Sequence, residues 1–263
     1  FWRQEPDPFT ISRDQVPFVF RPGTDYAYSN PGMAMLAYPV TAAIQGTAHR
    51  DIRTLLRERV MQPLGVGDEE WEVGYGRTFQ VDGLPLVANW GGGSYTARAA
   101  AAVGLLMMHG GRWQGREVLA EDAVRRMLRM PGTPRPTPSP ENPILVPGIC
   151  WWLNADGCWP EIPRDAFMGY GAGHEVMLVV PSLDLVLVRF GEWLGGDPEF
   201  SRWAELHRYL VEPLVDTLLP DLSADRAAAP YPQSPVIRSV RWDPPSTIIR
   251  RAYDSDNWPA TWA

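Results

Sequence analysis

The feature that most limits the possible folds of this sequence is a pair of apolar blocks on either side of a short turn. The blocks are Val176–Val180 and Leu185–Val188, and Pro-Ser-Leu-Asp separates them. Continuous apolar runs of this length, bounded by turn residues, are typical of strands that are buried on both faces. The sequence therefore predicts a strand hairpin in the core of a sheet, with a further strand over Ile149–Leu153.

A helix that covers this sheet is predicted next along the chain. Apolar residues recur at three-to-four spacing between Trp203 and Leu218, which is the period of one helix face. From about Pro220 the composition becomes that of a linker, with Val236–Val240 as one further candidate strand. We therefore expect a domain over residues 1–219 and a separate segment over 220–263, whose end resembles the start of a β-propeller-like domain.

The first half of the chain predicts helices. Residues up to about Asp25 are rich in proline and aromatic residues, which favours irregular structure. A helix is then expected to begin with Asn30 as its N-cap and Pro31 at the first helical position, where the missing N–H costs nothing. Further helices are expected at about 51–61, from the cap Thr96 to about 108, and at 121–130, before a proline-dense loop over 131–143.

Charge and composition exclude several classes of partner. The formal net charge is −7, and the arginines are scattered, so the chain has no basic surface of the kind that nucleic acids require. No apolar run reaches the roughly 18 residues of a membrane span. The four histidines are far apart and no Cys-x-x-Cys occurs, which gives no support to a metal site. We expect no cofactor.

The two cysteines leave one alternative open. Cys150 and Cys158 are eight residues apart, in a segment that is expected to form a strand, a turn over Asn154–Gly157 and a returning strand. A disulfide across that hairpin and two unpaired thiols are both compatible with the spacing, because bridging depends on a Cα separation below about 7 Å.

Four segments, in order, resemble one known family. They are Arg21–Asn30, which contains Pro-Gly-x-x-x-x-Tyr-Ser-Asn; Pro63–Val66; a Gly-Gly loop before Thr96 together with the Gly-Gly turn at 110–115; and the glycine turn Gly171–Glu175 that leads into the hairpin. This arrangement is similar to the β-lactamase-related serine hydrolases, which include class C β-lactamases, D-alanyl-D-alanine peptidases and esterases. The resemblance implies an α/β (α+β) fold: an antiparallel sheet flanked by helices, with an inserted helical region and the active site between them.

The chemistry of that family assigns roles to Tyr28 and Asn30. A serine hydroxyl is a poor nucleophile until a neighbouring base activates it, and the family's serine lies in Ser-x-x-Lys at a helix start. The resemblance implies that Tyr28 would pass protons together with that lysine and that Asn30 would hold the substrate and the lysine through its amide. Residue chemistry alone leaves another interpretation, in which Tyr28 is a packed aromatic and Asn30 an ordinary cap.

The nucleophile segment is missing from this sequence. All 24 basic residues are arginine, so no Ser-x-x-Lys exists anywhere in the chain. In the family that motif precedes Tyr-x-Asn. We therefore expect a piece of a longer parent, incomplete at the N-terminus and inactive by itself.

The family's Lys-Thr-Gly strand is also altered. Counting back without gaps from Pro181 places that motif on Ala166–Met168, which contains no lysine. Gly169 is then the candidate N–H donor for an oxyanion. His174 stands where the family usually has glycine, so it either lines the substrate cleft or has a structural role.

These observations predict an acyl-enzyme hydrolase acting on an ester, amide or D-amino-acid peptide, with a small-molecule or peptidoglycan-like substrate. Periplasmic or secreted location is what the resemblance implies. A non-catalytic binding or scaffolding module of the same fold is the alternative, and the residues upstream of Phe1 would distinguish the two. The sequence fixes neither the substrate nor the oligomeric state.

Overall fold

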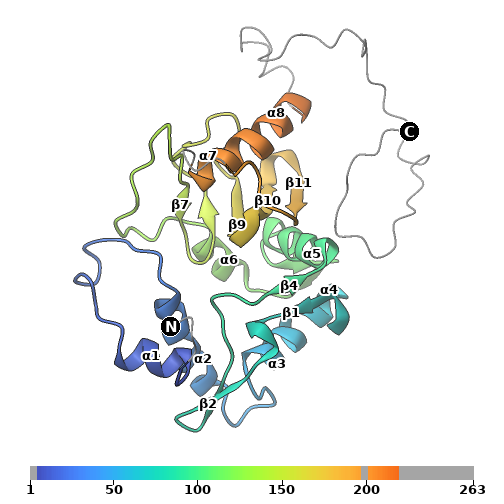
Figure 1. The fold of residues 1–263 in the computed structure, drawn as a ribbon. Coiled ribbons are helices and arrows are strands. Elements are labelled where there is room, and N and C mark those ends of the chain that lie inside the picture. Colours follow the sequence, from blue (N-terminus) through green and yellow to red (C-terminus); the bar gives the residue numbers. More distant parts are fainter. Residues whose placement is uncertain (1–4, 197–200, 219–263) are drawn as a thin grey trace.

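The computed structural model describes residues 5–196 and 201–218 (Figure 1). At its centre is an antiparallel five-stranded sheet with the strand order β11-β10-β9-β8-β7. In chain order the strands are β7 (Val146–Pro147), β8 (Trp152–Leu153), β9 (Phe167–Gly171), β10 (Glu175–Val180) and β11 (Leu185–Arg189).

The central hairpin confirms the prediction from the two apolar blocks. β11 pairs with β10 along its whole length, with Leu185 opposite Val180 and Arg189 opposite Val176. The turn η5 (Pro181–Leu183) ends at Asp184, whose φ of 49° is in the left-handed region that Asp tolerates better than most residues. Val176 and Leu178–Val180 are almost fully buried, as expected of a strand with both faces covered.

Helices cover both faces of the sheet (Figure 1). On one face lie α7 (Arg202–Leu206), the π-helical turn η6 (His207–Val211) and α8 (Glu212–Leu218), which form the predicted C-terminal helix. Its apolar residues pack against the side chains of Val176, Leu178 and Val180. The opposite face holds α5 (Ala97–Met108), where Gly104 permits close approach: a Cβ there would lie 2.8 Å from Val186 Cγ1. The antiparallel sheet flanked by helices is confirmed.

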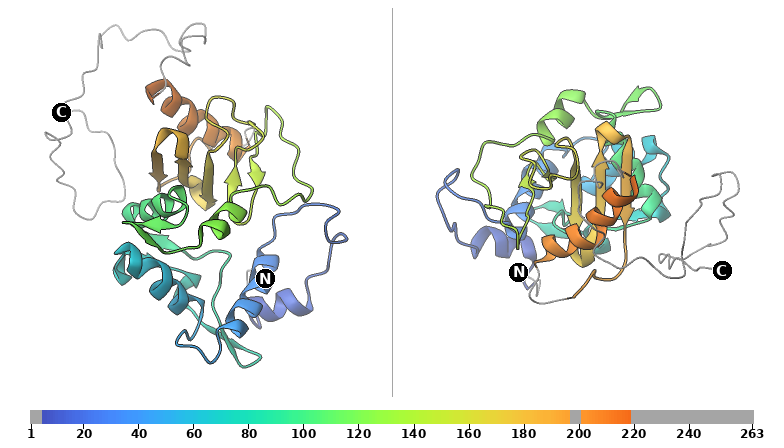
Figure 2. Two further views of the ribbon diagram at one scale, coloured as in Figure 1. Left: turned by 180° about the vertical axis from the view of Figure 1, so that it is seen from behind. Right: turned by 90° about the horizontal axis from the view of Figure 1, so that it is seen from above.

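A helical region lies on the other side of α5 (Figure 2). It contains α1 (Pro8–Asp14), α2 (Asn30–Ala43), α3 (Ile52–Leu56), the π-helical turn η1 (Arg57–Met61) and α4 (Gln62–Leu64). α5 joins the two halves of the molecule, because its Ala99, Ala102 and Leu106 pack against Met61 and Leu64.

Short elements complete the described chain. Between the helical region and α5 lie η2 (Asp68–Glu70), β1 (Trp71–Glu72), η3 (Gly74–Gly76), β2 (Phe79–Val81), β3 (Leu84–Leu86) and β4 (Ser94–Tyr95). After α5 come β5 (Arg112–Trp113), β6 (Arg116–Glu117) and α6 (Glu121–Met127), and η4 (Ala172–His174) connects β9 to β10. Strands β1 to β4 were not expected, because strands of two or three residues carry almost no periodicity.

The first helix was not expected. α1 forms inside the stretch that was predicted to be irregular, with Asp7 as its N-cap: Asp7 Oδ1 accepts hydrogen bonds from Phe9 N at 2.9 Å and Thr10 N at 2.8 Å. Pro8 occupies the first position of the helix, where proline is tolerated. The proline density that suggested a loop is therefore partly a helix-start signal.

The other helix predictions are mostly confirmed. Thr96 caps α5, because its Oγ1 accepts a hydrogen bond from Ala99 N at 3.1 Å. The helix predicted over 51–61 begins after Asp51 but continues through a π-helical turn to Leu64, where Gly65 adopts a left-handed conformation with φ 73°. α6 ends at Met127, three residues before the predicted end.

The segment around the cysteines differs from the prediction. The expected strand over Ile149–Leu153 is reduced to β8, and the returning strand does not form, although Gly157 N does donate to Asn154 O at 2.8 Å in the expected turn. Both cysteines are free thiols. Cys150 lies in a bend with a φ of 63° before β8 begins, and Cys158 also lies outside any strand, so the two cysteines do not face each other across a hairpin.

The segment 220–263, including the candidate strand Val236–Val240 and the β-propeller-like end, lies outside the described residues. Within the described ranges no helix combines the length and the apolar character needed to cross a membrane.

Candidate active site

Ser29, and not Asn30, caps α2. Ser29 has an extended backbone, and its Oγ accepts a hydrogen bond from Gly32 N at 3.0 Å. Asn30 is instead the first residue of the helix, followed by Pro31. The predicted cap was wrong by one residue because serine and asparagine are equally good caps and proline is tolerated throughout the first turn.

The shift of the cap frees the amide of Asn30. Its Oδ1 is buried and has no hydrogen-bond partner among the described residues. Buried side-chain oxygens are almost always paired in folded proteins, so an unpaired one requires an explanation. Helix capping does not explain the unpaired oxygen of Asn30, because Ser29 is the cap. Within the described chain the burial of this oxygen therefore has no hydrogen-bonding explanation.

Tyr28 precedes this helix and is 69% exposed. The alternative in which Tyr28 is a packed core aromatic is therefore wrong. Two residues earlier, burial raises the pKa of the Tyr26 phenol, and the nearby Tyr28 adds to that rise. The exposed phenol and the unpaired amide lie two residues apart at the start of one helix.

The predicted oxyanion strand is β9, and its outer edge is only partly covered. β8 pairs with β9 as far as Met168, which is opposite Trp152. Beyond that point, no strand of the described chain pairs with the edge of β9 that faces away from β10. An open edge of this kind can present a backbone N–H to a ligand.

The register identifies which N–H faces this open edge. Asn154 N donates to Ala166 O at 2.9 Å, so the polar groups of Ala166 point toward the β8 side. Polar backbone groups alternate between the two edges of a strand. Met168 and Tyr170 therefore point the same way, whereas Gly169 points toward Met177 of β10. The geometry favours the N–H of Tyr170, one residue after the predicted donor Gly169.

The residues at the predicted Lys-Thr-Gly position have no free polar side chain. Ala166, Phe167 and Met168 are each 2% exposed or less, and Phe167 packs edge-to-face on Trp151 with 5.2 Å between ring centroids. These side chains belong to the sheet core. The outward N–H of Tyr170 suggests that the alignment of the Lys-Thr-Gly motif should move one residue toward the C-terminus. Gly169 would then occupy the position of the glycine of that motif.

His174 is buried completely, and both its ring nitrogens are occupied. Leu194 N donates to Nδ1 at 3.0 Å, and Nε2 lies 3.1 Å from the backbone oxygen of Arg202. This pair of contacts corresponds to the neutral tautomer with its proton on Nε2, which is also 3.5 Å from Glu205. Burial is the main reason that the pKa of His174 is lowered.

The role of His174 is thus to join segments of the fold. It ties the β9–β10 turn to the chain at Leu194 and to α7, and its ring lies edge-to-face with that of Trp193 at 5.0 Å. Its φ of 57° is in the left-handed region, which agrees with glycine being usual at this position in the resembled family. These contacts favour the structural interpretation over a cleft-lining one.

The structure does not bring all four predicted residues together. Tyr28 and Asn30 stand at the start of α2, whereas Gly169 and His174 belong to the sheet and its turn. Among the described residues, no hydrogen bond, ion pair or ring contact joins the two pairs. The candidate active site therefore consists of one group of residues on each half of the fold.

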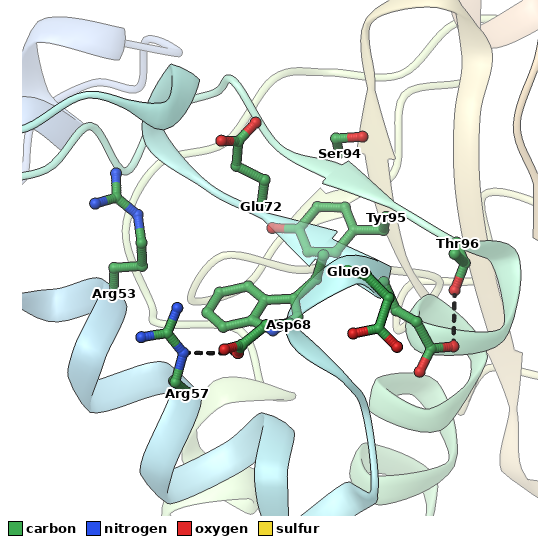
Figure 3. A pocket seen from close by; sticks show the side chains of 10 residues that line it. Arg53, Arg57, Asp68, Glu69, Glu72, Ser94, Tyr95 and Thr96 are labelled. Carbon is green, nitrogen blue, oxygen red and sulfur yellow. Dashed lines mark hydrogen bonds and ion pairs between the residues drawn. The ribbon is translucent and has the colours of Figure 1, made fainter.

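A cavity of about 440 Å³ lies elsewhere, between α3, β1 and β4 (Figure 3). It is lined by Arg53, Arg57, Asp68–Glu72 and Ser94–Thr96, and by none of the four predicted site residues. Within residues 5–196 and 201–218, no group of three or more His, Cys, Asp or Glu side chains could hold a metal ion.

The family model described as beta-lactamase matches residues 3–212. A structure assigned as a β-lactamase from Bacteroides dorei is 17% identical, with a TM-score of 0.54 over 79% of this chain and 61% of that one. A structure assigned as a 6-aminohexanoate-dimer hydrolase from Bacillus anthracis is 18% identical, with a TM-score of 0.53 over 81% of this chain and 48% of that one.

A third structure, a β-lactamase from Mycobacterium bovis, is 22% identical, with a TM-score of 0.50 over 78% of this chain and 67% of that one. Identities this low establish a shared fold and no more. No curated protein matches the chain. The chain spans 61% and 48% of the lengths of the first two solved structures that it resembles.

Proposed function

The chain belongs to the β-lactamase family, and from that premise we propose that it is part of a serine hydrolase that works through an acyl-enzyme. Tyr28 passes protons in this enzyme, Asn30 holds the substrate through its amide, and the edge of β9 contributes an N–H to the oxyanion site. The activated serine comes from residues outside this sequence, since the sequence contains no Ser-x-x-Lys.

The observation that carries the proposal is the state of Asn30. Its amide oxygen is buried and unpaired, while Ser29 performs the capping that would otherwise explain an asparagine at a helix start. An asparagine whose amide oxygen has no partner in the described chain, two residues from an exposed tyrosine, supports a site completed by residues outside this sequence, where a substrate N–H or a lysine ammonium would meet that amide.

The proposed substrate class is an ester, amide or D-amino-acid peptide. Acyl transfer to serine requires a base, an oxyanion donor and a positioning group, and the proposed residues supply the last two and a proton path. The absence of lysine at the Lys-Thr-Gly position favours an esterase over a β-lactamase. The parent is expected in the periplasm or outside the cell.

A labelling experiment tests the source of the nucleophile. The chain is treated with a fluorophosphonate and, separately, with a penicillin, and intact-mass and peptide mass spectrometry are used to find adducts. We expect none. An adduct on any serine of residues 1–263 would contradict the proposal that the nucleophile lies outside this sequence.

A second experiment tests the role of Tyr28. The coding sequence is extended upstream by about 100 residues, a span set by typical domain size, and hydrolysis of p-nitrophenyl esters is measured. Tyr28→Phe is expected to lower kcat by about 10²–10⁴-fold, the usual contribution of a proton-transfer residue. Tyr209→Phe is the matched control, because Tyr209 is 45% exposed and lies on the distant turn η6.

The alternative is a non-catalytic binding or scaffolding module of the same fold. The extended protein distinguishes the two functions. Upstream residues that contain Ser-x-x-Lys and support ester hydrolysis favour the enzyme. A substituted serine, with no hydrolysis above the uncatalysed rate, favours the module.

A further inference from the structure

The large apolar side chains that the fold leaves uncovered are concentrated beside the proposed active site. Of the fifteen exposed large apolar or aromatic side chains among the described residues, six lie between positions 16 and 40. These six are Val16, Phe18, Val19, Tyr28, Leu36 and Val40. Single exposed apolar residues are ordinary on a protein surface, whereas a concentration of them marks a surface that another segment or partner covers.

Helix α2 buries its small residues and exposes its large ones. Ala34, Ala37 and Thr41 are almost fully buried, and the two alanines pack against residues of α1 and β3. Leu36 and Val40 lie on the neighbouring face of the helix, and both are exposed, Leu36 to 47%. An amphipathic helix normally buries its largest apolar residues. One face of α2 is therefore packed, and the next has no covering element within the described chain.

The loop that leads into α2 is uncovered as well. It joins α1 to α2 over residues 15–29 and extends outward before it returns to α2 (Figure 1). Phe18 is 95% exposed, and its neighbour Val19 is also exposed. No hydrogen bond of the described chain ties residues 17–28 to another part of the fold; Thr24 N, for example, donates to Arg21 O within the loop at 3.1 Å. The loop therefore presents apolar side chains that its own fold does not use.

Tyr28 lies in the chain between these two uncovered parts, and its proposed role indicates what covers them. A phenol exchanges a proton with a hydroxyl only within hydrogen-bond reach, about 2.6–3.2 Å between the two oxygens. The segment that carries the activated serine must therefore approach the start of α2. Leu36 lies six residues after Asn30, which is about 9 Å along the helix axis. A segment that reaches Tyr28 is thus close enough to cover the exposed face of α2.

The composition and spacing of α2 indicate that its partner is a helix with an apolar face. Helix α2 contains no charged residue, which is typical of a helix that is buried on all sides. Leu36 and Val40 are four positions apart, so their side chains form a ridge along one side of the helix. Ridges of this kind pack into the grooves of a neighbouring helix.

We propose that the exposed face of α2 and the loop over residues 15–29 form the docking surface for the segment that carries the activated serine. This segment contributes a helix whose apolar face packs on Leu36 and Val40, and it also covers Phe18 and Val19. The inference rests on the proposed function, since it takes the covering segment to be the source of the nucleophile. Docking buries α2 completely and brings the serine hydroxyl to the phenol of Tyr28.

Leu36→Asp, made both in this chain and in the protein extended upstream by about 100 residues, tests the surface. In this chain Leu36 is exposed, so the melting temperature should change by less than about 2 °C. In the extended protein the new carboxylate would face an apolar helix, and the melting temperature should fall by at least about 5 °C. Leu56→Asp is the matched control, because Leu56 is an exposed leucine on α3, and it should shift both proteins equally.

Hydroxyl-radical footprinting with mass spectrometry measures the same surface in the two unchanged proteins. Phe18 and Leu36 should be oxidised several-fold more slowly in the extended protein, because a covered side chain is less accessible to the radical. Tyr209, on the turn η6, is the control and should be oxidised at the same rate in both proteins. This measurement does not depend on the folding of any variant.

Ester hydrolysis by the extended protein separates the docking surface from the proposed function. Slower oxidation of Phe18 and Leu36 without hydrolysis would support the docking surface and contradict the catalytic role of the docked segment. Hydrolysis with both residues as reactive as in this chain would overturn the docking surface and leave the proposed function standing. Equal shifts of the melting temperature by Leu36→Asp in the two proteins would also overturn the docking surface.

Discussion

The start of α2 and the β9–β10 turn both contain a polar residue that the family resemblance singles out, yet the fold treats them in opposite ways. Asn30 keeps a buried amide oxygen without a partner, next to the exposed Tyr28. His174 is fully buried, and each of its ring nitrogens is satisfied by the backbone. A satisfied polar group has a structural explanation, whereas the contacts of the described chain give none for the amide oxygen of Asn30.

This difference predicts that His174 contributes far more to stability than Asn30. His174→Ala removes two hydrogen bonds and leaves a cavity in a packed turn, so it should lower the free energy of unfolding by about 2–4 kcal/mol. Urea denaturation followed by circular dichroism measures the change. His109→Ala, at the exposed end of α5, is the control and should stay within about 0.5 kcal/mol. A His174→Ala protein as stable as the control would remove the distinction between the two regions.

The same region should make stability depend on pH. Burial lowers the pKa of His174 in the folded chain below its unfolded value, so the folded state favours the neutral ring. The unfolded chain therefore binds more protons just below the unfolded pKa of about 6.5, and stability must fall as the pH decreases through that value. His174→Gln carries no titratable ring and should lose this part of the pH dependence. Identical pH profiles of stability for the two proteins would show that His174 does not titrate in this way.

The cap at the start of α2 supplies a smaller test. Ser29→Ala removes the acceptor for Gly32 N and should cost about 1 kcal/mol of unfolding free energy. Asn30→Ala should cost nothing, because the Asn30 amide oxygen has no partner to lose. Chemical denaturation of both variants, compared side by side, measures the difference. A greater loss from Asn30→Ala than from Ser29→Ala would restore Asn30 as the cap.

The smallest effect is expected at Tyr28. Tyr28 is 69% exposed, so Tyr28→Phe should change the free energy of unfolding by less than about 0.5 kcal/mol. Differential scanning calorimetry provides the measurement. A large loss of stability would mean that the Tyr28 side chain makes packing contacts that stabilise the fold. Those contacts would then explain the residue without a catalytic role.

Much of the fold could be predicted from local patterns. The hairpin β10–β11, the C-terminal helix α7–α8 and the cap of α5 at Thr96 depend on short-range periodicity or on one capping residue. The predictions that failed depend on contacts between distant residues. The expected returning strand after Gly157 does not form, and strands β1 and β4 acquire their pairing only when residues more than 20 positions apart meet.

The candidate site divides in the same way. The motif around Tyr28 and Asn30 can be found in the sequence, because it lies within a few residues of a helix start. The cap at Ser29 and the outward N–H of Tyr170 could not be predicted from the sequence. A shift of one residue changes which residue caps the helix, or which N–H faces the edge of the sheet, and it leaves the amino-acid composition unchanged. The cavity between α3, β1 and β4 had no signal at all, because its lining residues come from elements that only packing brings together.

The sequence by itself determined the buried hairpin, its covering helix, the family resemblance and the lack of any lysine to activate a serine. These follow from residue identity and periods of two to four positions, which act locally. Only the tertiary structure decided that His174 is satisfied and Asn30 is not, because pairing depends on Leu194, Arg202 and other residues remote in the chain. Whether a buried polar group has a partner is a property of the packed molecule.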